Sequence, residues 1–205
     1  MVRSLPYLHI KRKEIKMNNN IKFPVPRVSY FKGPVTDIRP AGVCDLREIG
    51  EMIRRDERLE CLTREYRALT DKEERREFKK TRLPYITPSG VFSKRMADGF
   101  VRHSGLVCLD FDDVRNYDLL RCDLLHDKCY ETAFLFRSPS GGLKWFVCLP
   151  WMNEANDQRA TFDEIRAHVL YEYGADADKS GSDVCRACFL CHDENVFINH
   201  KFLAI

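Results

Sequence analysis

An apolar run at residues 103–109 is followed at once by three carboxylates: Asp110, Asp112 and Asp113. A run of this kind is typical of a buried strand, and residues two apart on a strand point to the same face. Asp110 and Asp112 therefore project side by side, with Phe111 on the other face. Two hard oxygen donors suit Mg²⁺ or Mn²⁺, which can clamp the reacting oxygens of a phosphoryl transfer. Alone, the pattern is weak, because an acidic loop before a helix would look the same.

The stretch RSPSGGLKWF, residues 137–146, predicts a phosphate-binding turn. Ser140 and the glycine pair that ends at Gly142 expose backbone N–H groups and let a phosphate approach closely. Lys144 adds a positive charge on the strand next to Asp110, and we expect its side chain to be exposed. A plain hairpin turn would also use these residues, but the cations near both ends favour a triphosphate or nucleic-acid site.

A third polar stretch, residues 176–199, reads DADKSGSDVCRACFLCHDENVFIN. Asp183 or Asp178 could complete the metal site, and Arg186 could hold a phosphate through two hydrogen bonds. The same stretch contains a possible zinc set: Cys185, Cys188, Cys191 and His192. On a strand these three cysteines do not share a face, and no glycine-rich knuckle surrounds them. We therefore interpret the thiols as small hydrophobic side chains packed in the core.

Helices are predicted in the first half of the chain. Apolar residues at helical spacing form two stripes, Leu46, Ile49 and Ile53, then Leu59, Leu62, Tyr66 and Leu69. Thr70 followed by Glu73 fits a capping box and predicts the start of a third helix. The charged stretch DKEERREFKK in that helix favours a solvated face over a surface that contacts phosphate.

The second half predicts alternating strands and helices that position the polar stretches. Two short extended pieces flank the Pro-Ser-Gly turn at residues 88–90. The elements that follow are a strand at 104–111, a helix at 116–126 with Leu119, Leu120 and Leu124 inward, strands at 131–137 and 143–149, a helix at 154–173 with Phe162, Ile165, Val169 and Leu170 on one side, and strands at 186–191 and 196–198.

This β-α-β-β-α-β order is the ferredoxin-like motif, whose sheet order is 4-1-3-2 with the first strand central. In that topology the ends of residues 104–111, the turn at 138–142 and the start of 186–191 meet at one edge of the sheet. The three polar stretches should therefore converge. The predicted class is α+β, with an RRM/ferredoxin-like sheet and an N-terminal α/β extension.

Composition sets broad limits on the protein. The 205 residues are 44% hydrophobic and 32% charged, and 34 Lys and Arg against 31 Asp and Glu give a net charge of +3. We expect a tail at residues 1–20 and one domain at 21–205, with its RRM-like core at about 104–199. No apolar run is long enough to span a bilayer, and the N-terminus lacks the apolar core of a signal peptide. We therefore expect a cytoplasmic protein without a membrane partner, whose nine cysteines are thiols.

The stretches LDFDD, SPSGGLK and DVCRACFLCHDENVFIN together resemble the archaeo-eukaryotic primase superfamily. RVSYFKGPVTD, LPYITPSGVFSKR and HSGLVCLDFDD are similar to the primase-like N-terminal domain of virulence-associated protein E-type primase–helicases from phages and mobile elements. The likeness spans roughly residues 27–200. It implies an RRM-like catalytic sheet packed with an N-terminal α/β unit.

The resemblance also implies roles for single residues. Asp110 and Asp112 occupy the first, metal-binding motif, and the second, nucleotide-binding motif falls on Ser140, Gly142 and Lys144. In the third motif the resemblance implies Asp183 as the carboxylate and Arg186 as its basic neighbour, with Asp178 as the alternate carboxylate.

The implied activity is that of a DNA primase or polymerase-type nucleotidyltransferase that uses Mg²⁺ or Mn²⁺ in the replication of a phage or mobile element. Its partners would be nucleoside triphosphates and a single-stranded DNA template. Many active members carry His where this chain has Lys144, and Lys is not an equivalent acid–base group. A catalytically inactive nucleic-acid-binding or assembly module therefore stays open, as does a metal-dependent phosphodiesterase. The sequence has no P-loop motif, so any helicase is missing from this chain or supplied by another.

Overall fold

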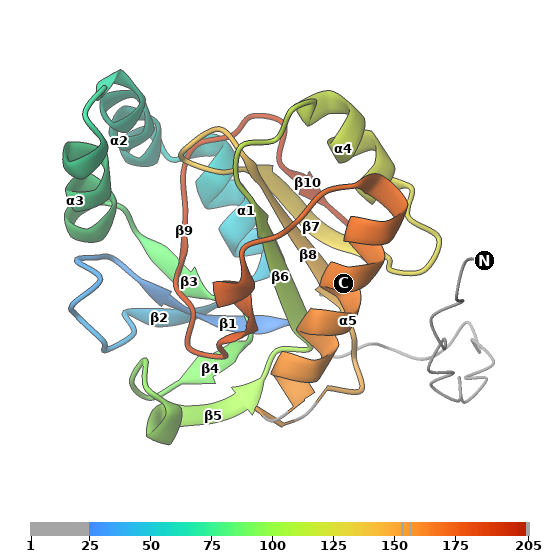
Figure 1. The fold of residues 1–205 in the computed structure, drawn as a ribbon. Helices are drawn as coiled ribbons and strands as arrows, with labels where there is room; N and C mark the ends of the chain where they lie inside the picture. The colour runs from blue at the N-terminus through green and yellow to red at the C-terminus, as the bar shows by residue number, and fades with distance from the viewer. Residues whose placement is uncertain (1–24, 153, 156, 204–205) are drawn as a thin grey trace.

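The computed structural model describes residues 25–152, 154–155 and 157–203, so the predicted tail at 1–20 lies outside the described residues. The strands are β1 (Arg27–Phe31), β2 (Gly42–Asp45), β3 (Tyr85–Thr87), β4 (Gly90–Phe92), β5 (Phe100–His103), β6 (Leu106–Phe111), β7 (Thr132–Arg137), β8 (Leu143–Cys148), β9 (Cys188–Phe189) and β10 (Phe197–Ile198). The α-helices are α1 (Leu46–Arg55), α2 (Glu57–Ala68), α3 (Lys72–Arg82), α4 (Tyr117–Leu125) and α5 (Asp157–Tyr173). Figure 1 shows their arrangement.

The sheet that carries the acidic stretch has the strand order β10-β7-β8-β6. β8 is antiparallel to both β6 and β7, so these two strands run parallel to each other, as the sequence predicts. In the register of β6 and β8, Asp110 pairs with Lys144 and Phe111 with Leu143. The end of β6 therefore lies beside the start of β8, directly after the glycine turn.

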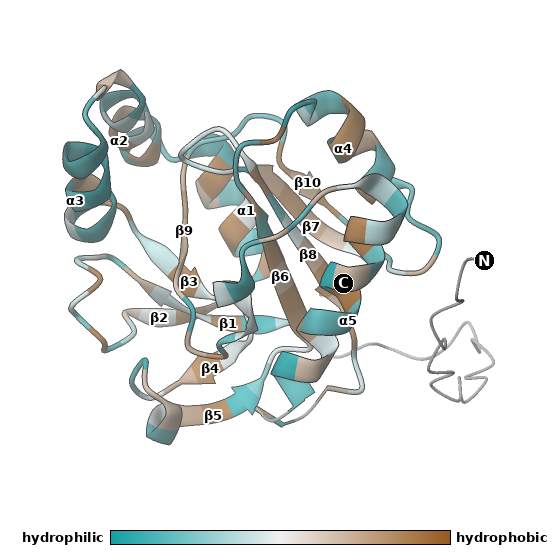
Figure 2. Cartoon of the chain, in the orientation of Figure 1, coloured by the Kyte–Doolittle hydropathy of each residue, from teal (hydrophilic) through white to brown (hydrophobic). Residues whose placement is uncertain are grey.

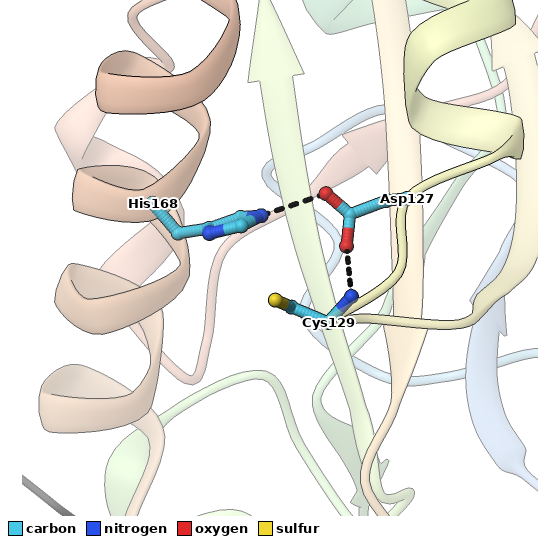
Figure 3. Close-up of side chains that lie close together, drawn as sticks. All are labelled: Asp127, Cys129 and His168. Carbon is cyan, nitrogen blue, oxygen red and sulfur yellow. Dashed lines mark hydrogen bonds and ion pairs between the residues drawn. The ribbon is translucent and has the colours of Figure 1, made fainter.

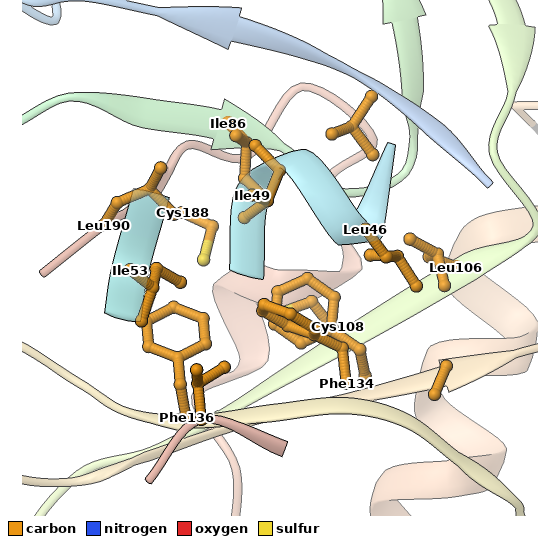
Figure 4. Close-up of a cluster of buried hydrophobic side chains, with 14 of the residues drawn as sticks. Leu46, Ile49, Ile53, Ile86, Leu106, Cys108, Phe134, Phe136, Cys188 and Leu190 are labelled. Atoms are coloured by element: carbon orange, nitrogen blue, oxygen red, sulfur yellow. The ribbon is translucent and has the colours of Figure 1, made fainter. Parts of the chain in front are cut away.

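Both faces of this sheet are buried, which explains why its strands are continuously apolar (Figure 2). Helices α4 and α5 cover one face, with Val107 and Leu109 of β6 packed against apolar residues of the two helices. On the other face Leu106 and Cys108 of β6 pack toward α1. Figure 4 shows that helix between the two sheets, with its side chains filling the space. Asp110 follows Cys108 at the spacing of two, so it points to the face shared with the second sheet.

The second sheet has the order β2-β1-β3-β9, and a separate ribbon pairs β4 with β5. The predicted place of the last core strand is therefore wrong. β9 hydrogen-bonds with β3 of the second sheet, where Tyr85 pairs with Phe189, and does not join β6. Among the described strands β6 pairs only with β8, so it ends its sheet and is not central. Only residues 188–189 of the predicted strand 186–191 form a ladder. A strand of two residues could not have paired with the whole length of β6.

The helices differ in detail from the sequence prediction. The third helix is capped by Asp71, whose side chain accepts the N–H of Glu74, and not by Thr70. Leu119 and Leu170, which we expected inside, are 57% and 44% exposed.

The α+β class itself is confirmed by the antiparallel sheets and the five α-helices of the described residues. In the described part of the chain, no helix is both long and apolar enough to cross a membrane.

Candidate functional site

Lys144 forms an ion pair with Asp110 across β8 and β6. The expected exposure of Lys144 is wrong, because only 6% of the residue is accessible. Burial alone would lower the pKa of Lys144, but the Asp110 carboxylate and the nearby Cys188 and Cys108 thiols raise it well above its usual value. The ammonium is therefore kept charged inside the protein, where it neutralises Asp110.

Asp110 keeps one oxygen free for a further ligand. Its Oδ2 accepts the Lys144 hydrogen bond, whereas Oδ1 is buried and has no hydrogen-bond partner among the described residues. A small pocket surrounds the pair, and its lining includes Ser89, Cys108, Gly181, Arg186 and Cys188. A buried carboxylate oxygen without a partner is costly, and a cation would satisfy it.

Two more carboxylates lie beside Asp110. The backbone N–H of Asp178 donates to the backbone carbonyl of Asp110 at 2.9 Å, which fixes Asp178 next to the end of β6. Burial and repulsion by Asp110 raise the pKa of Asp112, and Asp178 also contributes to this rise. Burial would raise the pKa of Asp178, but hydrogen bonds from Ser180 lower it overall, together with the charge of the Arg186 guanidinium.

Of the two predicted third-motif carboxylates, the structure brings Asp178 to the site. Arg186 Nη2 lies 3.2 Å from Asp178 Oδ2, so these two predicted residues meet. Asp183 accepts the backbone N–H of Cys185 at 2.9 Å and stabilises the turn after residues 179–182. Neither Asp178 nor Asp183 lines the described pocket, so Asp178 is placed at the site by its contacts with Asp110 and Arg186.

The glycine turn packs directly against the acidic strand end. A Cβ placed on Gly142 would lie 2.1 Å from the Phe111 carbonyl oxygen, so only glycine fits this position. The Ser140 hydroxyl is hydrogen-bonded to the Tyr66 hydroxyl at 2.9 Å, and it accepts from Lys79 Nζ at 3.4 Å. The turn thus joins the sheet edge to α2 and α3.

Sequence reasoning missed Lys79. It lies in the charged stretch that we interpreted as a solvated helix face, yet its charge also acts on the pKa of Asp112. A helical residue of an exposed, highly charged segment gives no sequence signal for such a contact, because the contact depends on how α3 packs against the turn.

The comparisons with known proteins add one finding at this point. The model of the BT4734-like N-terminal domain family matches residues 78–197. The chain belongs to this family. Searches of curated proteins and of solved structures found no match. The matched region of this BT4734-like domain contains Asp110, Asp112, Asp178 and the whole glycine turn.

The cysteines of the third polar stretch are divided between core and surface in this BT4734-like domain. Cys188 and Cys191 are buried, whereas Cys185 is half-buried. The Cys191 thiol donates to the Arg137 carbonyl oxygen at 2.9 Å, and burial raises its pKa to about 12. Cys188 shares a hydrogen bond with Cys108 next to Lys144. The buried thiols thus pack as small apolar groups, as we interpreted them.

The chemistry of these side chains suits a divalent cation, although the ligand atoms of Asp110, Asp112 and Asp178 do not all lie within 4.8 Å of one another. Asp110, Asp112 and Asp178 bring three carboxylates to one edge, where Lys144 pairs with Asp110, Arg186 pairs with Asp178 and the charge of Lys79 acts on Asp112. Carboxylate oxygens are the ligands that Mg²⁺ and Mn²⁺ prefer. A divalent cation of this kind would also satisfy the buried Oδ1 of Asp110, which has no hydrogen-bond partner among the described residues.

Proposed function

We propose that this domain is a metal-dependent nucleotidyltransferase of the archaeo-eukaryotic primase type, which acts in the replication of a phage or mobile element. The observation that carries the proposal is the free, buried Oδ1 of Asp110 at an edge where Asp112 and Asp178 also lie. The resemblance of the three polar stretches to that superfamily supports it, with one difference from its usual sheet: β9 lies in the second sheet.

In this proposal Asp110, Asp112 and Asp178 would hold Mg²⁺ or Mn²⁺. The bound ion would supply charge neutralisation for the attacking and leaving oxygens of phosphoryl transfer. The 3′-hydroxyl oxygen of a primer forms a bond to the α-phosphorus of a nucleoside triphosphate, the bond to the β-phosphate oxygen breaks, and diphosphate leaves. The hydroxyl proton passes to solvent.

The cations of the site have different parts in this reaction. Arg186, which lines the pocket, and Lys79, which contacts Ser140 of the turn, would bind phosphate oxygens. Lys144 is buried against Asp110, so we assign it to positioning that carboxylate rather than to direct phosphate contact. Gly142 would act by keeping the turn packed against β6, because its missing Cβ leaves room for the Phe111 carbonyl and not for a phosphate.

A primer-extension and de novo synthesis assay on single-stranded DNA, with Mg²⁺ and with Mn²⁺, tests the activity. Asp112→Asn and Asp178→Asn should each abolish extension and weaken Mn²⁺ binding measured by calorimetry. Asp113→Asn is the matched control, because Asp113 is a neighbouring exposed carboxylate with φ of 50°, a conformation that Asn tolerates. Asp183→Asn distinguishes the two third-motif candidates and should retain activity.

A catalytically inactive nucleic-acid-binding module is the second candidate. One observation favours it: Lys144 already neutralises Asp110 without a metal ion. That module would bind single-stranded DNA and show no extension with either ion, and Asp112→Asn would leave DNA binding unchanged. Release of nucleotides from labelled DNA without extension would indicate a phosphodiesterase instead.

A further inference from the structure

The loop between α4 and β7 meets α5 at three side chains of metal-binding type. The ligand atoms of Asp127, Cys129 and His168 all lie within 4.8 Å of one another, and Figure 3 shows them facing a common space. This group is separate from the acidic edge, which is formed by Asp110, Asp112 and Asp178 at the end of β6. β7 begins at Thr132, which is level with Val147 of β8, whereas the acidic edge lies three residues away along β8, at Lys144.

Asp127 is held in one orientation by its surroundings. Its side chain is 1% exposed. One carboxylate oxygen accepts the backbone N–H groups of Cys129 and Tyr130, at 2.8 and 2.7 Å. The other oxygen accepts the Tyr173 hydroxyl at 2.7 Å and lies 2.7 Å from His168 Nε2. Burial would raise the pKa of Asp127, but these hydrogen bonds lower it overall, so the carboxylate is ionised at neutral pH.

His168 is held as firmly as Asp127. Two aromatic rings pack in a T-shaped arrangement with the imidazole, with ring centroids 5.1 Å away for Tyr130 and 6.2 Å away for Tyr173. His168 Nε2 therefore points at Asp127 from α5, while the exposed Cys129 approaches from the loop. Ordered ligands of this kind lose little conformational entropy when an ion binds.

We propose that Asp127, Cys129 and His168 form a binding site for a zinc-type divalent ion. Carboxylate, thiolate and imidazole together are the donor set of Zn²⁺, whereas Mg²⁺ and Mn²⁺ disfavour thiolate. The ion replaces the direct hydrogen bond between His168 and Asp127, and a water fills the fourth position on the exposed side of Cys129. Tyr173 stays hydrogen-bonded to the ligating carboxylate as an outer-shell partner. The bound ion joins the α4–β7 loop to α5.

Titration of the full chain with Co²⁺ tests the site, because a cobalt ion bound to thiolate gives a near-ultraviolet charge-transfer band. We expect a band that saturates at one ion per chain and is lost when Zn²⁺ is added. Zn²⁺ should also raise the melting temperature. Cys129→Ser should remove both the band and the rise, and it should fold, since the described hydrogen bond of Cys129 uses the backbone N–H. Tyr173→Phe should weaken Co²⁺ binding by about 10- to 100-fold.

Two matched variants separate this site from an exposed thiol elsewhere in the chain and from the acidic edge formed by Asp110, Asp112 and Asp178. Cys61→Ser changes another exposed thiol, on α2, and should leave the band unchanged. Asp112→Asn removes a carboxylate of the acidic edge and should also leave the Co²⁺ band unchanged. The test of the zinc-type site is therefore independent of the nucleotidyltransferase proposal. No thiolate band in the unaltered protein, or a band of equal strength in Cys129→Ser, would overturn the proposal.

Discussion

Lys144 and Asp110 illustrate how burial changes the meaning of a charged residue. Removal of the lysine alone would leave a carboxylate that is 27% exposed and has no cation on its Oδ2. Lys144→Met keeps most of the side-chain volume, so the expected loss of unfolding free energy, about 1–3 kcal/mol, comes from the unpaired acid. Urea unfolding measures it.

Two further variants test whether the unpaired acid causes that loss. Asp110→Asn in the Lys144→Met background should recover most of the lost stability, because no uncompensated charge remains. The exposed Lys72→Met should change the unfolding free energy by less than about 0.5 kcal/mol. Equal stability of Lys144→Met and the unaltered protein would mean that solvent already screens Asp110.

Asp127 should make the stability of the protein depend on pH. Its pKa is lower in the folded chain than in the unfolded chain, where Asp has a pKa of about 3.9. Stabilisation by the ionised carboxylate is therefore complete above that value and is lost as the pH falls through the folded pKa. Asp127→Asn should cost about 1–3 kcal/mol at pH 7. The difference from the unaltered protein should shrink below about pH 4, and a difference that stays constant down to pH 2 would contradict this assignment.

At the residue scale, the sequence was sufficient to pick out the acidic and basic side chains of the candidate site, but not to predict which of them contact one another. The alternation along the strand correctly predicts that Phe111 is buried on one face while Asp110 lies on the other, whereas Asp112 follows the end of β6 and its predicted common face with Asp110 stays a prediction. The sequence left Asp178 and Asp183 as alternatives, because both precede the same short strand. The backbone hydrogen bond from Asp178 to Asp110 brings Asp178 to the site. It forms between two segments that are 68 residues apart, so no local pattern predicts it.

At the scale of elements, the turn before β8 depends on one close contact. Gly142 lies against the Phe111 carbonyl, where a Cβ would be 2.1 Å away. Gly142→Ala should therefore push the turn away from β6, lower the unfolding free energy by about 1–3 kcal/mol, and weaken Mn²⁺ binding. Gly42→Ala is the control, because nothing lies within 4 Å of a Cβ at that position. Chemical unfolding and calorimetry measure both effects, and equal behaviour of the two variants would exclude a role for the contact.

Elements with strong periodicity were predicted well. β6, α4, β7, β8 and α5 occur where the sequence predicts them, within a few residues at each end. The placement of β9 failed for a physical reason. Two residues of extended chain carry no signal for which sheet they join, and the choice depends on β3, whose Tyr85 and Ile86 lie about a hundred residues earlier.

For the whole molecule, the two sheets depend on one shared core. Val28 of β1 and Ile49 of α1 pack in the same cluster as Phe134 and Phe146 of the other sheet. The family match begins at residue 78, so it leaves out β1, β2, α1 and α2. A fragment of residues 78–205 would expose the sheet face that α1 covers.

That fragment should consequently lack a cooperative thermal transition and bind a hydrophobic dye, as a loosely packed state does. A fragment of residues 25–205 retains every described strand and helix and is the control. Calorimetry and dye fluorescence distinguish the two. Cooperative melting of the shorter fragment would show that the second sheet is dispensable.

The segment that brings Asp178 to the acidic edge also affects self-association. It lies along the open side of β6, where Asp178 donates to Asp110 and a Cβ on Gly181 would be 3.0 Å from the Cys108 carbonyl. An uncovered strand edge pairs readily with another chain. A tryptic cut after Lys179 or Arg186 would release this cover. Chains nicked at these bonds should therefore aggregate through β6, while intact chains stay dispersed.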